Sequence, residues 1–109
     1  MSTAIIILKN TKEYSNKFTA AFSSYRRCVT YMKQYVDDIM MDKSTRVEVS
    51  NYNGSLNLVV NAEEFQFDFL QVNLSDPYDF KFISTIADEI VAYVNNSYKN
   101  RSENHGNVS

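Results

Sequence analysis

The chain has 109 residues, 44% of them hydrophobic, and it carries a formal net charge of −2 at pH 7. This length and apolar content predict one folded domain and exclude an intrinsically disordered protein. Glycine occurs twice and proline once, which excludes a glycine-rich phosphate loop and predicts long elements joined by short loops. The longest apolar run is too short for a signal peptide or a membrane span, so we expect a cytoplasmic protein without membrane contact.

The N-terminal third predicts a strand followed by one long helix. Residues 4–8 form an unbroken, mostly β-branched run, which suits a strand covered on both faces. Asn10 and Glu13 then have the spacing of a capping box, and apolar residues recur at three- and four-residue steps over residues 14–40. We therefore expect a helix over residues 11–41. Because helices average about 11–12 residues, a break at Ser23 and Ser24 is the alternative.

The middle of the chain predicts three strands that form a meander. Hydrophobic and polar residues alternate over residues 46–50, 56–61 and 65–74. The Asn53-Gly54 pair between the first two strands is the strongest short signal for a hairpin. After Phe69 the apolar positions shift by one residue, to Leu70 and Val72. This shift indicates either a bulge or a change of the apolar face near the edge of the sheet.

A second helix is expected in the C-terminal part. Asp76 is placed to cap it, Pro77 suits its first position, and Asp79 would complement the positive end of its dipole. The helix would run to about Tyr98 and bury one face, made of Phe80, Ile83, Ala87, Ile90, Val91 and Val94. Residues 1–99 then form the single domain, and residues 100–109 form a flexible polar tail.

Together these elements predict an α+β fold with the order β-α-β-β-β-α. We expect a mainly antiparallel sheet, with the long first helix and the C-terminal helix packed on one face. Because a helix-length connection would follow the first strand, that strand could lie parallel to a neighbour.

The residue types that small enzymes use are scarce in this chain. The only histidine, His105, lies in the expected tail, and the only cysteine, Cys28, falls in the apolar pattern, where a buried hydrophobe is expected. Three pairs of adjacent acids, at residues 37–38, 63–64 and 88–89, would face solvent rather than each other. We therefore expect no enzymatic activity, no metal site, no cofactor and no small-molecule substrate.

Charge is distributed unevenly along the chain, and this pattern concerns binding partners. Residues 1–36 carry six basic side chains and one acid, whereas residues 37–95 carry eleven acids and three basic side chains. On the outer face of the expected first helix, basic residues are interleaved with tyrosine, as on surfaces that bind nucleic acid. An ordinary solvated helix face is the other interpretation. The residues concerned are Lys17, Arg26, Arg27, Tyr31 and Lys33.

The expected last helix carries more apolar surface than one packing contact uses. Beside its inner face, Phe82, Ile86 and Tyr93 form a second line at helical spacing. An exposed aromatic line is typical of a contact surface for a protein partner or a second copy. Burial between the sheet and the first helix is the alternative. We expect either a dimer or a monomer whose second line is filled by its target.

The function that these observations favour is that of a small, acidic, non-enzymatic binding protein that acts through protein–protein interaction. Richness in Asn, Ser, Lys, Ile and Tyr is typical of A/T-rich genomes. The finer hypothesis is therefore a phage or mobile-element accessory protein that inhibits or adapts a host factor. Nucleic-acid binding through the basic helix face is the alternative. A small nuclease-type toxin, suggested by element order alone, comes third.

Overall fold

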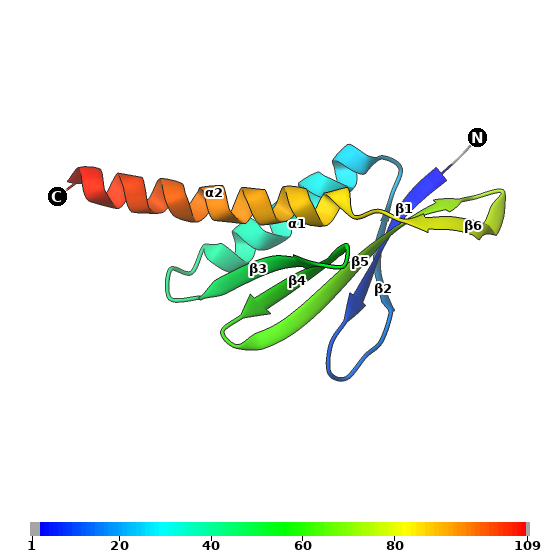
Figure 1. Ribbon diagram of the computed structural model, residues 1–109, viewed down its shortest axis with the longest axis horizontal. Coiled ribbons are helices and arrows are strands. Elements are labelled where there is room, and N and C mark those ends of the chain that lie inside the picture. Colours follow the sequence, from blue (N-terminus) through cyan, green and yellow to red (C-terminus); the bar gives the residue numbers. More distant parts are fainter. Residues whose placement is uncertain (1–2, 109) are drawn as a thin grey trace.

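Six strands and two helices make up the computed structural model, which describes residues 3–108 and gives the backbone alone for Pro77 and residues 100–108 (Figure 1). Every strand pairing among these residues is antiparallel. The α+β class is confirmed, but the element order is β-β-α-β-β-β-β-α. The elements are β1 (Thr3–Asn10), β2 (Lys17–Phe22), α1 (Tyr25–Met40), β3 (Val47–Tyr52), β4 (Ser55–Val60), β5 (Glu63–Asn73), β6 (Asp76–Phe82) and α2 (Thr85–Val108).

The sheet is built around β5. β1 pairs along it, from Thr3 opposite Asn73 to Asn10 opposite Gln66. On the other edge of β5, β4 pairs with the first half and β6 with the second half. β2 and β3 are the outer strands in the order β2-β1-β5-β4-β3. β5 therefore joins the β3–β4 hairpin to β6, and these two extend to opposite sides of the sheet in Figure 1.

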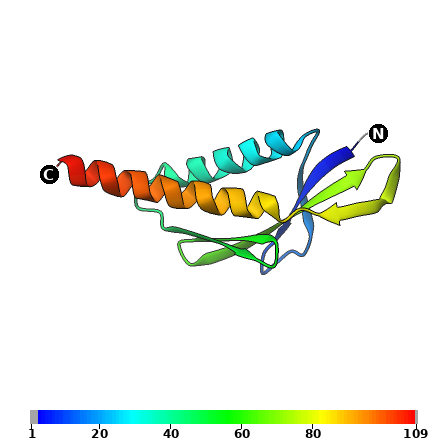
Figure 2. The ribbon, with the colours of Figure 1, turned by 45° about the horizontal axis from the view of Figure 1, so that its top comes forward.

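Both helices cover the same face of the sheet, as the sequence predicted (Figure 2). α2 contacts β3 and β4, and α1 contacts α2 and β2. The core between these layers is apolar, since no polar or charged side chain of the described residues is buried. No helix of the described residues covers the opposite face. The largest fully buried side chains are Phe67, Phe69, Ile7, Met32, Leu56, Leu58, Ile86, Ile90, Val36, Val94 and Cys28.

The prediction of a helix over residues 11–41 is wrong in its first half. The chain turns back after β1, with Asn16 at a φ of 52°, and forms the outer strand β2. α1 begins at Tyr25, where Ser24 is the N-cap and its hydroxyl accepts a hydrogen bond from the backbone N–H of Arg27 (3.2 Å). The alternative break at Ser23 and Ser24 gives the start of α1 correctly, but the segment before it contains a strand and not a helix. Because β1 and β2 form a hairpin, β1 is antiparallel to both of its neighbours.

A bulge in β2 explains why its sequence has the spacing of a helix. Ile7 pairs with Ala20 but Leu8 pairs with Phe18, so β2 carries one extra residue at this point. As a result Phe18 and Ala21, three positions apart, both lie on the side away from the helices. In a regular strand residues of one face are two positions apart, whereas a three-residue step is typical of a helix.

The prediction that the last helix begins at Asp76 is also wrong. The Asp76 carboxylate does accept a hydrogen bond from a backbone N–H, that of Tyr78 (3.1 Å), and the Asn73 side chain accepts one from Ser75 (2.9 Å). The Asn73 bond lies in the turn between β5 and β6, and the Asp76 bond lies at the start of β6, where its register with β5 shifts. An aspartate or asparagine can bond to the backbone two residues on in such places as well as at a helix start.

α2 begins instead at Thr85 and continues to Val108, past the expected end at Tyr98. Residues 100–108, expected to be a polar tail, continue this helix; the side chain of His105 and all of Ser109 lie outside the described part. Of the residues expected on the inner face, Ala87, Ile90 and Val94 are buried and Ile83 and Val91 are half-buried. Phe80 is the exception, because it lies in β6.

The shift of apolar positions in β5 is a change of face and not a bulge in its pairing with β1, which continues without interruption past Phe69 and Leu70. Phe69 is buried beneath the helices. Leu70 and Val72 lie on the opposite side, where their partners in β6 are Phe82 and Phe80. The face-change alternative is therefore confirmed.

Cys28 is fully buried in the core, as its place in the apolar pattern indicated. Burial raises the pKa of Cys28 from 9.0 to about 12, because a thiolate loses its hydration there. Between these values the unfolded chain releases a proton that the folded chain keeps, so we expect the free energy of unfolding to fall as the pH rises above about 9.

Two measurements check this expectation. A thiol reagent at neutral pH should label Cys28 only after urea unfolds the chain. Cys28→Ala should reduce, without abolishing, the loss of stability at alkaline pH, since the pKa values of Tyr25, Tyr35 and Tyr93 are also raised. Rapid labelling of the folded chain would show that the thiol is accessible and that this part of the core is wrongly assigned.

Candidate partner-binding surface

The face of the sheet opposite the helices carries a contiguous set of apolar side chains. Strand register defines the set, because cross-strand partners share a face. In one row Ile6 of β1 and Phe82 of β6 flank Leu70 of β5. In a second row Ala4 and Phe80 flank Val72, and in a third Leu8 lies between Phe18 and Asp68. We call this set the uncovered patch, and it consists of Ala4, Ile6, Leu8, Phe18, Leu70, Val72, Phe80 and Phe82.

Three phenylalanines of the uncovered patch are well exposed. Phe18 is 60% exposed, Phe80 49% and Phe82 68%. The rings of Phe80 and Phe82 pack edge to face, with centroids 6.2 Å apart and an angle of 81° between their planes. Each Å² of apolar surface left in water forgoes roughly 25 cal/mol of stabilisation. A contiguous exposed patch of this kind is typical of an interaction site.

Acidic side chains adjoin the uncovered patch on the same face. Glu48, Glu64 and Asp68 share this side by the register of β3, β4 and β5. The Asp68 carboxylate accepts hydrogen bonds from the side-chain amide of Asn10 (3.2 Å) and from the hydroxyl of Ser55. The described strands thus give this face acids and no basic side chain, since their lysines alternate onto the other side: Lys9, Lys17 and Lys81.

The three residues predicted to bind a partner do not form one exposed line. Phe82 lies in β6 and belongs to the uncovered patch. Ile86 is fully buried in the first turn of α2, so the burial alternative is right for this residue. Tyr93 is half-buried, and its hydroxyl donates to the Asp37 carboxylate, 2.8 Å from each oxygen. This hydrogen bond raises the pKa of Tyr93. The prediction that these three residues form one exposed line along the last helix is therefore wrong.

Sequence reasoning missed most of the uncovered patch. Phe80 and Phe82 were assigned to a helix because Asp76 and Pro77 suggested a helix start. A signal for a strand was nevertheless present, since the two phenylalanines flank Lys81 at a two-residue period. Together with the shift of apolar positions at Leu70, this period indicates a second hairpin whose apolar side faces away from the main core.

The basic residues predicted to bind nucleic acid do not share one helix face. Lys17 lies in β2, with its ammonium group 4.8 Å from the ring centroid of Tyr14. Tyr31 is half-buried, and its ring packs against that of Phe22, with centroids 5.1 Å apart. These two residues are therefore separated from the outer face of α1.

The rest of this basic set lies on α1. The ammonium group of Lys33 is 5.1 Å from the ring centroid of Tyr93. Arg26 and Arg27 are exposed in the first turn, which contains no acid. Positive charge is disfavoured at this end of a helix, so the two arginines do not help α1 to form.

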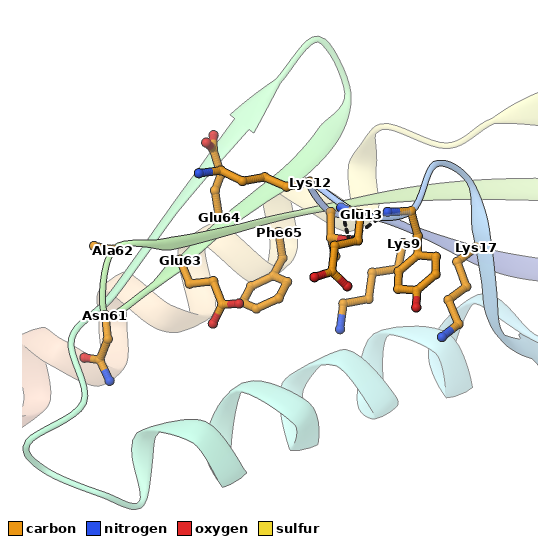
Figure 3. Close-up of a pocket in the computed structure, with 11 residues that line it drawn as sticks. Lys9, Lys12, Glu13, Lys17, Asn61, Ala62, Glu63, Glu64 and Phe65 are labelled. Atoms are coloured by element: carbon orange, nitrogen blue, oxygen red, sulfur yellow. Dashed lines mark hydrogen bonds between the residues drawn. The ribbon is translucent and has the colours of Figure 1, made fainter.

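A separate pocket of about 540 Å³ lies between the loop after β1 and the turn after β4 (Figure 3). Lys9, Lys12 and Lys17 line it. The Lys9 ammonium is 4.7 Å from the ring centroid of Phe65. In Figure 3 Lys9 and Lys17 point to the same side of the sheet, whereas Glu64 points to the other side.

Comparison with protein-family models, with curated proteins and with solved structures finds no match for this chain. Among the described residues, neither helix is long and apolar enough to cross a membrane, and no three His, Cys, Asp or Glu side chains are grouped closely enough to hold a metal ion. Function is therefore argued from the surfaces of this molecule.

Proposed function

We propose that this chain is a small, non-enzymatic binding protein and that the uncovered patch is its contact surface for a protein partner. The observation that carries the proposal is the exposure of Phe18, Phe80 and Phe82 on one face that no helix of the described residues covers. Aromatic side chains are enriched in the cores of protein interfaces, and a few such residues supply most of the binding energy.

The acids beside the uncovered patch indicate the chemistry of the partner. Glu48, Glu64 and Asp68 would face basic side chains around an apolar centre, which favours a partner with a hydrophobic surface rimmed by Lys or Arg. Such complementary charge speeds association and orients the two proteins more than it adds affinity. In its more specific form, the proposal is that the partner is a cytoplasmic host factor, which the chain inhibits or adapts.

Nucleic-acid binding is the second candidate, and one observation favours it. Arg26 and Arg27 are exposed at the positive end of α1, where they would contribute to anion binding rather than to helix stability. We give it second place because Lys17 and Tyr31 are held elsewhere, and of the predicted basic set only Arg26, Arg27 and Lys33 remain together on α1. Arg26→Ala with Arg27→Ala should remove salt-sensitive binding to an oligonucleotide if this candidate is right.

The test of the protein-binding proposal is the double variant Phe80→Ser with Phe82→Ser. Proteins retained by the immobilised chain from cells of its source are quantified by mass spectrometry, and the affinity of the purified partner is then measured by calorimetry. Because buried aromatic anchors each contribute about 2 kcal/mol or more, we expect the affinity to fall by at least about 30-fold.

Met41→Ser is the matched control, since Met41 is 78% exposed and follows α1, away from the uncovered patch. It should leave the affinity unchanged. Circular dichroism establishes that each variant is folded, and sedimentation shows whether the partner is a second copy. Retention of the same partner at equal affinity by the double variant would overturn the proposal.

A further inference from the structure

Two lysines lie directly opposite each other in the β1–β2 hairpin. Lys9 and Lys17 are cross-strand partners, so their side chains share one side of the sheet, the side of the buried Phe67 with which Lys9 also pairs. Like charges at directly opposed positions destabilise a sheet. The pairing of Lys9 with Lys17 is therefore unfavourable for the stability of the hairpin.

Aromatic rings, and not carboxylates, hold these two ammonium groups. The Lys9 nitrogen is 4.7 Å from the ring centroid of Phe65 and 5.9 Å from that of Phe67, and the Lys17 nitrogen is 4.8 Å from that of Tyr14. A ring face attracts a cation without neutralising its charge. Within the described residues neither lysine has an ion-pair partner.

The pocket onto which these groups open is preformed by local hydrogen bonds. The Thr11 hydroxyl accepts from the backbone N–H groups of Glu13 (3.2 Å) and Tyr14 (3.1 Å), and the Asn10 side chain accepts from the N–H of Asn16 (2.7 Å). The volume of about 540 Å³ is typical of a small-molecule site. Lys12 also lines the pocket, but in Figure 3 its side chain extends away from Lys9 and Lys17, to the side on which Glu64 points.

Three glutamates also line the pocket, and they restrict the class of ligand. Glu13 and Glu63 are exposed and repel any anion in the pocket, so a ligand must gain more from the lysines than it loses to these two carboxylates. Glu64 also lines the pocket, but its side chain points to the other side of the sheet in Figure 3. A phosphate dianion has the charge density to be held between two lysines. The carboxylates can in turn accept hydrogen bonds from hydroxyl groups on the remainder of such a ligand.

We infer that this pocket binds a small molecule that carries a phosphate or diphosphate group, held between Lys9 and Lys17. This site is separate from the uncovered patch and does not depend on the proposed protein partner. It departs from the sequence-based expectation of no small-molecule substrate.

The test uses inorganic pyrophosphate and the full chain, with affinity measured by calorimetry and stability by thermal melting. Lys17→Gln should weaken pyrophosphate binding about tenfold, because a charged hydrogen-bond donor is lost. Without pyrophosphate the same variant should melt at or above the wild-type temperature, since the repulsion from Lys9 is relieved. With saturating pyrophosphate it should melt below the wild type, so the order of stability reverses.

Two control variants give opposite expectations. Lys81→Gln, which removes a lysine from β6, should leave pyrophosphate affinity unchanged. Glu63→Gln should increase it, because a repelling carboxylate is removed. Equal losses in Lys81→Gln and Lys17→Gln would overturn the inference in favour of general attraction by surface lysines. So would the absence of pyrophosphate binding, or binding of a single-stranded oligonucleotide alone.

Discussion

Ile86→Glu is expected to unfold the chain, whereas Phe82→Glu is expected to leave it folded. The two residues are four positions apart, but Ile86 is fully buried in a core where none of the described residues contributes a buried charge. A carboxylate at this position has no partner, so the loss should exceed about 4 kcal/mol, close to the whole stability of a marginal domain. Phe82 is on the uncovered patch, where the new carboxylate stays hydrated and the loss should remain below about 1 kcal/mol.

Urea denaturation followed by circular dichroism measures both losses. Ile86→Val, which removes one methylene group, should lose only about 1 kcal/mol and shows that the position tolerates a smaller apolar side chain. Wild-type stability in Ile86→Glu would mean that this side of α2 does not face the core. Unfolding of Phe82→Glu would mean that the uncovered patch is itself covered in the folded chain.

Phe67→Ala is expected to lose about 3–5 kcal/mol of unfolding free energy, the range measured when a buried phenylalanine is removed. Phe67 is fully buried in β5, with Lys9 and Leu56 as its partners on the two neighbouring strands. Its ring also meets that of Tyr35 in α1 edge to face, with centroids 5.6 Å apart. The alanine variant therefore opens a cavity at the point where β1, β4 and α1 meet.

Phe82→Ala is the matched control for this cavity, because it deletes the same atoms from an exposed position of the sheet. It should change the unfolding free energy by less than about 1 kcal/mol. The comparison separates burial from the strand propensity of phenylalanine, which both variants lose. Equal losses in the two variants would show that the helices do not cover the side of the sheet that carries Phe67.

Some elements were predictable because the signal for them is local. Asn53 and Gly54 adopt φ values of 53° and 89°, and positive values at both positions are what the two-residue hairpin turn requires. The Asn51 side chain accepts a hydrogen bond from the N–H of Gly54 (2.8 Å), a contact within the turn, and its amide group also donates to the Asp88 carboxylate of α2 (2.6 Å). The Ser24 cap of α1 is local in the same way.

Both wrong helix predictions rest on local sequence patterns that occur in strands and turns as well as in helices. The three-residue step from Phe18 to Ala21 is produced by a bulge in β2, yet it has the spacing of a helix. Asp76 bonds to the backbone two residues on at the start of β6, as it would at a helix start. Pairing with β1 and β5 selects the strand in both cases, and this pairing joins residues distant in sequence.

The sequence by itself determined the α+β class, the β3–β4 hairpin and the apolar character of the core, because these depend on composition, turn residues and local alternation. Only the tertiary structure decided which apolar residues remain exposed. Of the residues predicted to bind a partner, Phe82 is exposed and Ile86 is buried, although both are large and apolar. The difference arises because α2 packs Ile86 onto the sheet. Phe82 lies in β6 and pairs with Leu70 of β5, so its side chain is on the side without helices. Burial depends on which distant element covers a side chain, and no local pattern of residues specifies that.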